Sequence, residues 1–122
     1  MTPPIFEICS ADTSVQALLG DGPTLRLYPF GEALQKDRLP YAVWSIGGGQ
    51  PENYLGQVPD VDLLTLHLDV YGKTAESARE VRDAIVAAIE TEAHVVSWDG
   101  ERRDAETRAY RISLTADWIV DR

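Results

Sequence analysis

Cysteine, histidine and basic residues are all scarce in this chain of 122 residues. The single Cys9 cannot form an internal disulfide, and a zinc site made of four cysteines is excluded. The histidines are His67 and His94, so a metal site with three ligands would need carboxylates from distant parts of the chain. These shortages leave few ways to build a metal or redox centre.

Long apolar runs are also missing. No stretch approaches the roughly 18 apolar residues that a membrane-spanning helix needs. The N-terminal segment MTPPIFEICSADTS lacks a basic region followed by an apolar run, so it does not have the form of a secretory signal. We therefore expect no membrane association, and we expect the chain to fold in the cytoplasm.

Positive charge is outweighed by negative charge. Eleven Lys and Arg residues face twenty Asp and Glu residues, which gives a net charge of −9. Such a surface repels phosphate backbones and anionic lipid headgroups. The balance argues against nucleic-acid recognition, although it is compatible with DNA passing nearby without being held.

The length favours a single domain that spans residues 1–122. A chain of this size buries roughly two-thirds of its unfolded surface, which is enough for one apolar core. With 44% hydrophobic and 25% charged residues, the composition is that of an ordinary globular protein.

The first third of the chain predicts a short helix and two strands. The segment from Ser10 to Gly20 is expected to be helical, with Ser10 or Asp12 as its N-cap, Gly20 as a left-handed stop, and an apolar stripe of Val15, Leu18 and Leu19. The run TLRLYPF alternates, with Leu25 and Leu27 on one face and Arg26 and Tyr28 on the other, and Pro29 ends it or makes it an edge. GEALQKDR reads as loop, and LPYAVWSI as a strand.

The middle of the chain contains the clearest pattern. Gly47 to Asp60 has four glycines and two prolines, which predicts a loop that is either functional or a flexible hinge. A strand follows, with Leu64, Leu66, Leu68 and Val70 on its buried face. After Gly72, Thr74 caps a helix whose outer side pairs Arg79 with Asp83 and whose buried stripe is Ala78, Val81, Ile85, Ala88 and Ile89.

The last third predicts a long hairpin. Its second arm alternates, with Tyr110, Ile112, Leu114, Ala116, Trp118 and Val120 inward. The tip, from Asp99 to Arg108, holds four acids and three arginines. The order of the elements predicts an α+β fold in which two helices pack on one face of a mainly antiparallel sheet.

Each candidate for catalytic or metal chemistry has a simpler structural explanation. His67 and Asp69 share one strand face as two metal ligands could, but a polar outer face explains them more simply. Gly47, Gly48 and Gly49 follow a strand without the Lys-Ser/Thr pair of a phosphate loop. Cys9 lies among apolar neighbours, as a buried thiol does. We find no nucleophile elbow and no obvious acid–base pair, so the sequence favours a protein that is not an enzyme and has no cofactor or metal.

Taken in order, several stretches resemble those of one family, the tail-completion or tail-terminator proteins of long-tailed bacteriophages and prophages. The stretches are ALLGD (residues 17–21), LRLYP (25–29), LPYAVWSIGG (39–48), LHLDVYGKTAESA (66–78) and the final TADWIV. The resemblance implies a structural virion tail protein that forms a ring, typically a hexamer, at the head-proximal end of the tail tube. Its partners would be copies of itself, the tube protein and the head-side connector, with DNA passing through unbound.

On that reading, two segments become candidate interfaces. Tyr54, Leu55 and Val58 lie in the glycine-rich loop and could become ordered when the ring assembles. Arg102, Arg103 and Asp104, in the hairpin tip, could pair with a neighbouring subunit or the tube; equally, the tip could simply be solvated. Two alternatives remain open: another neck or tube component of related fold, and a small ligand- or metal-binding α+β domain.

Overall fold

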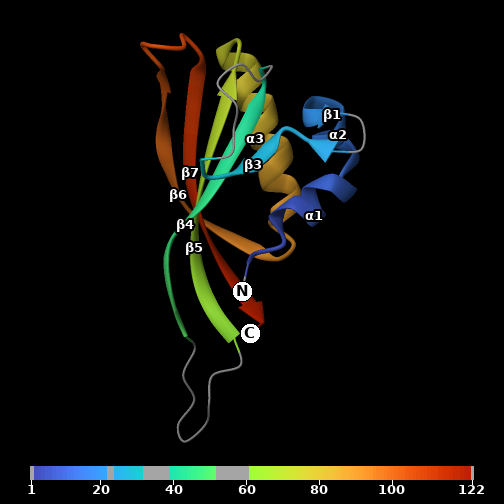
Figure 1. Ribbon diagram of the computed structural model, residues 1–122, viewed down its shortest axis with the longest axis vertical. Helices are drawn as coiled ribbons and strands as arrows, with labels where there is room; N and C mark the ends of the chain where they lie inside the picture. The colour runs from blue at the N-terminus through green and yellow to red at the C-terminus, as the bar shows by residue number, and fades with distance from the viewer. Residues whose placement is uncertain (1, 22–23, 32–38, 52–60, 122) are drawn as a thin grey trace, which may run out of the picture.

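The computed structural model describes residues 2–21, 24–31, 39–51 and 61–121 (Figure 1). Five strands form one sheet in the order β3-β4-β5-β7-β6. In chain order they are β3 (Leu27–Pro29), β4 (Tyr41–Pro51), β5 (Val61–Gly72), β6 (Ala93–Arg103) and β7 (Tyr110–Asp121). The pair β3–β4 is parallel, and the other three pairs are antiparallel.

Helices cover one face of this sheet (Figure 1). They are α1 (Ile5–Ala11), α2 (Thr13–Leu19) and α3 (Ala75–Ile89). A second, two-stranded sheet joins β1 (Gly20–Asp21) to β2 (Thr24–Leu25) in the same layer as α1 and α2. The prediction of an α+β fold with a mainly antiparallel sheet is confirmed, with three helices in place of the expected two.

The strand and helix in the middle of the chain form as predicted. The four apolar side chains of β5 are buried, and so is the whole predicted stripe of α3. Thr74 caps α3 by accepting a hydrogen bond from the backbone N–H of Ser77 at 3.0 Å. The predicted pair of Arg79 with Asp83 is wrong, because Arg79 binds Glu101 on β6 instead.

The N-terminal helix is longer and broken in two. Asp12 separates α1 from α2 and caps α2, since its carboxylate accepts the N–H groups of Ser14 and Val15. The helix α1 went unpredicted, although Pro4 stands directly before it, as prolines commonly do at a helix start. Gly20 is extended, with φ −61° and ψ 136°, so the predicted left-handed stop is wrong.

Arg26 was predicted on the strand face opposite Leu25 and Leu27, but it is itself buried, with 8% exposed, and lies between β2 and β3. Its guanidinium donates hydrogen bonds to three backbone carbonyls, those of Pro40 at 2.9 Å, Leu18 at 3.0 Å and Gly20 at 3.2 Å. One side chain therefore joins the end of α2 to the segment before β4. Strict alternation fails here because Arg26 interrupts the strand between Leu25 and Leu27.

The glycine run was expected in a loop, but Gly47, Gly48 and Gly49 lie within β4. A bulge between Ile46 and Gly48 offsets the register with β5, and the pairing then continues to Pro51 opposite Asp62. Neither a phosphate-binding loop nor a hinge is present at these glycines. A long ladder to β5 overrides their low strand propensity.

The last hairpin is confirmed, with a shorter tip than predicted. Asp99 to Arg103 belong to β6, and the turn begins at Asp104. Four of the six predicted inward residues of β7 are buried: Ile112, Leu114, Ala116 and Trp118. At the opposite end of the molecule, β4, β5 and β7 extend beyond the helices (Figure 1).

Candidate assembly surfaces

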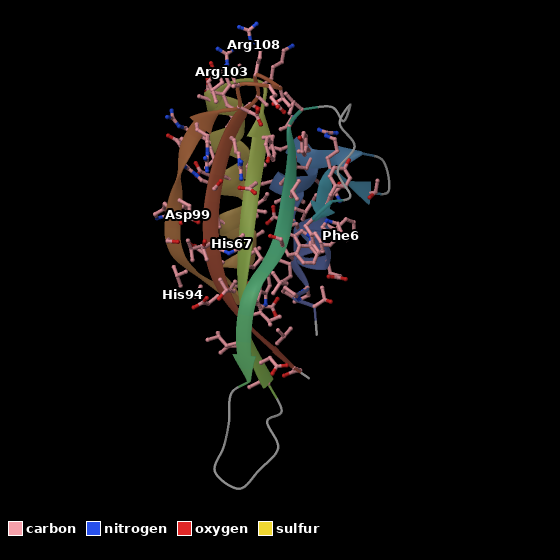
Figure 2. All side chains as sticks on the ribbon, turned by 60° about the vertical axis from the view of Figure 1, so that its left-hand side comes forward. Phe6, His67, His94, Asp99, Arg103 and Arg108 are labelled. Carbon is pink, nitrogen blue, oxygen red and sulfur yellow. The ribbon has the colours of Figure 1, made fainter. Side chains whose placement is uncertain are left out.

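The hairpin tip satisfies much of its own charge. The carboxylate of Asp104 accepts the N–H groups of Glu106 and Thr107, which fixes the turn. The guanidinium of Arg103 lies 5.3 Å from the ring centre of Tyr110 and donates to the carbonyl of Arg108. Figure 2 shows Arg103 and Arg108 at this end of the sheet. Arg102 and Arg103 end β6 and Asp104 begins the turn, so all three lie at this end of the sheet; their role in an interface stays a prediction.

Beside the tip lies a hollow of about 250 Å³, lined by the start of α3 and the ends of β6 and β7. Its lining residues are Ala75, Arg79, Glu101, Arg102, Arg103, Tyr110, Arg111 and Ile112. Arg79 donates two hydrogen bonds to Glu101, at 2.7 and 3.0 Å. This bond lowers the pKa of the Glu101 carboxyl and raises that of Arg79, so the pair holds opposite charges over a wide pH range.

The face of the sheet away from the helices carries a polar network. Asp69 on β5 accepts a hydrogen bond from Ser113 and pairs with Arg111 at 3.2 Å, both on β7. The guanidinium of Arg111 also lies 5.8 Å from the ring centre of Tyr71, which stacks on Tyr41. A predicted polar outer face is thus present, and its members are connected to one another.

A second set of polar side chains crosses the same face lower down. Thr115 donates to Asp99, and Nδ1 of His67 lies 3.1 Å from the Thr115 hydroxyl. Ser97 also donates to Asp99, and these two hydrogen bonds lower the pKa of that carboxyl. His67 and Asp69 therefore have different partners. Among the residues that the structure describes, no group of three or more His, Cys, Asp or Glu is placed to hold a metal ion.

The ring of His67 occupies space that Gly47 leaves free on the neighbouring strand. A Cβ added to Gly47 would overlap Nε2 and Cδ2 of that ring. We expect Gly47→Ala to lower the free energy of unfolding by about 1–2 kcal/mol, because the ring must move and give up Thr115. Urea unfolding measures this change.

A double-mutant cycle separates this contact from a general effect on β4. Combined with His67→Ser, the substitution Gly47→Ala should cost about 1 kcal/mol less than it does alone, since the obstructing ring is gone. Equal costs in the two backgrounds would show that the ring contact is not the cause.

Cys9 is fully buried in the core, as predicted. Burial raises the pKa of its thiol to about 12, and the charge of Asp12 adds to the shift. The reactive thiolate is therefore not populated near neutral pH, which does not suit a nucleophile. The predicted interface residues Tyr54, Leu55 and Val58 lie outside the described residues.

Several large apolar side chains are exposed, and the sequence analysis missed them. They are Phe6, Phe30, Ile46, Val96, Trp98 and Ile119. Val96 and Trp98 stand on the edge strand β6, and Ile46 on the lower half of β4. The sequence around Val96, Trp98 and Ile46 has an ordinary strand pattern. Such a pattern does not distinguish an edge strand from a central one. No helix in the described part of the chain is long and apolar enough to cross a membrane.

Comparison with known proteins identifies the family. The model of the family described as Tail completion protein gp17 matches residues 3–121. No curated protein matched the chain. Among solved structures, a chain from the "Virion of native gene transfer agent (GTA) particle" superimposes with a TM-score of 0.63 and 16% identity, covering 97% of this chain and 92% of that chain. The latter match shows a shared fold. Since the family match spans nearly the whole sequence, this chain belongs to the tail completion protein gp17 family and is a phage-type structural protein of the virion tail.

Proposed function

We propose that this protein is a single assembly domain of residues 1–122 that forms a closed ring, of six copies, on the head-proximal end of the tail tube. The ring stops further addition of tube protein and presents a docking surface to the head-side connector. The family match over residues 3–121 carries this proposal. The chemistry needs no catalytic group or cofactor, because the function lies in the shape and contacts of the subunit.

The arrangement of the sheet supports a ring. Helices cover one face (Figure 1). The opposite face carries the network of Asp69, Ser113, Thr115 and Asp99, of which Asp99 is labelled in Figure 2. A polar face of this kind is suited to a water-filled bore. With a net charge of −9 on each copy, the ring repels the DNA backbone, so the genome passes without being held. Arg102, Arg103 and Asp104, together with Tyr54, Leu55 and Val58, are proposed contacts with neighbouring subunits or the tube.

Loss of the protein should change tail length. Particles made without it are expected to carry overlong tails that are not joined to heads, since nothing ends tube growth or docks the connector. Electron microscopy of particles from a deletion strain measures both outcomes, and the wild-type gene supplied in trans serves as the control. Tails of normal length on filled heads would refute the proposal. Purified protein that forms long tubes would assign it to the tube instead.

A further inference from the structure

Within the described part of the chain, the main sheet has open stretches on both of its sides. The strand β6 pairs with β7 on one side, and none of the described residues pairs with its other side. At the opposite side of the sheet, β3 covers only Ala42 to Trp44 of β4. The lower part of β4, from Ser45 to Pro51, therefore also has an open side within the described part of the chain.

The lower β4 edge has a bulge between Ile46 and Gly48, but it lacks the charged side chains that protect many free strands. Natural proteins guard exposed edges with charged side chains, and the eleven residues of β4, YAVWSIGGGQP, contain none. Its proline stands at the very end of the strand. An uncharged strand of this length is typical of one that is covered in the assembled protein.

Apolar side chains are exposed along both edges. Trp98 is 61% exposed and Val96 47% exposed on β6, and Ile46 is 39% exposed on β4. Trp98 pairs with Leu114 and Ile46 with Leu66, which are both buried under the helices. Trp98 and Ile46 therefore lie on the same side of the sheet, the helix side. Phe6, on α1 in the helix layer, is 37% exposed (Figure 2).

The directions of the two strands are compatible with lateral association. The strand β6 runs toward the hairpin tip, and β4 runs away from it (Figure 1). Two copies placed side by side in the same orientation would bring β6 of one against β4 of the next in antiparallel order. Because the two edges differ and lie on opposite sides of the subunit, the contact is heterologous and can close into a ring.

We propose that Val96 and Trp98 on β6 of one copy pack against the lower β4 edge, Ser45 to Pro51, of the next copy. Trp98 covers Ile46 of that neighbour. This inference rests on the proposed ring and names the surfaces that close it. Across the sheet of one subunit, Trp98 lies at the same level as Trp44. Contact between Trp98 and Ile46 of the next copy therefore requires the two subunits to be staggered by two residues. Closed sheets with tilted strands have a stagger of this kind. Two bulges in β6 and one in β4 interrupt a regular ladder, so apolar packing supplies most of the contact.

One-sided variants test this contact. Ile46→Glu blocks the β4 edge, and Trp98→Glu blocks the β6 edge. Both side chains are partly exposed, so each variant should remain folded, and its urea unfolding curve checks this. Native mass spectrometry should show a ring for the wild type and monomers for each variant alone. An equimolar mixture should give dimers that grow no further, because one intact contact remains between the two variants. The matched control is Ile119→Glu, an exposed apolar residue of β7 that lies past the end of β6 and on the sheet face opposite Trp98 and Ile46, which should still form rings.

Disulfide cross-linking tests the same contact inside particles. This test also applies if the purified wild-type protein stays monomeric in solution. A chain carrying both Ile46→Cys and Trp98→Cys should give covalent multimers on a non-reducing gel of purified virions. Monomers alone on that gel, or rings formed normally by both glutamate variants, would overturn the contact. Neither result would refute the proposed function of the protein. That function is refuted by a different observation, namely normal tails on particles that lack the protein.

Discussion

Replacing Arg26 with methionine is expected to lower the free energy of unfolding by about 3–4 kcal/mol. The side chain donates to the carbonyls of Leu18, Gly20 and Pro40, and the substitution removes all of these charge-assisted bonds while keeping the length of the side chain. The carbonyls would remain in a region too enclosed for full hydration, which adds a desolvation cost. Thermal unfolding should show a fall in Tm of roughly 10 °C.

The same substitution at Arg79 is the matched control. Arg79 also makes two good hydrogen bonds, but to Glu101 at the surface, where water replaces a lost partner. Arg79→Met should therefore change Tm far less than Arg26→Met. Similar shifts in the two variants would mean that the buried carbonyls find other donors. Arg26→Lys should be intermediate, because one ammonium cannot reach all three oxygens.

Gly72→Ala is expected to cost about 3 kcal/mol, because α3 passes directly over the end of β5 at this residue. An added Cβ would lie 2.6 Å from the backbone N of Ala78, and 2.9 Å from its Cα and its Cβ. These atoms belong to the first turns of a helix, so relief requires a shift of the helix away from the sheet and loosens the core below it. Urea unfolding measures the cost.

The control for Gly72 is a glycine with an unusual backbone and free space. Gly100 has φ +108°, and a Cβ there would meet nothing within 4 Å. Gly100→Ala should cost about 1 kcal/mol, from backbone strain alone. If Gly72→Ala costs no more than Gly100→Ala, the close approach of α3 is not what demands a glycine.

The sequence predicted most accurately where local pattern and burial agree. In β5 and α3 the spacing of the apolar residues matches the geometry of the element, and Thr74 stands at a cap position. The strand, the helix and its buried stripe are therefore confirmed. The prediction of a loop at the end of β4 was wrong. Gly47 to Pro51 are poor strand formers, but pairing with β5 keeps them in the strand. Local propensity does not contain that information.

The candidate interfaces were less predictable for a related reason. The hairpin tip around Arg102 could be located from its charges, but its internal bonds depend on how the turn at Asp104 folds. The exposure of Trp98 and Ile46 depends on which strands end up at the sheet edges. Strand order arises from contacts between distant parts of the chain, so the open edges can be recognised only after folding.

The enclosed position of Cys9 makes this molecule convenient to label. Its sulfur lies in the core with a pKa of about 12, and it is the sole cysteine in the sequence. Maleimide dyes or nitroxide probes would therefore attach selectively to one cysteine introduced on the surface, with the native thiol left in place. Distances between such probes on successive copies could then report the geometry of the oligomer directly on the virion.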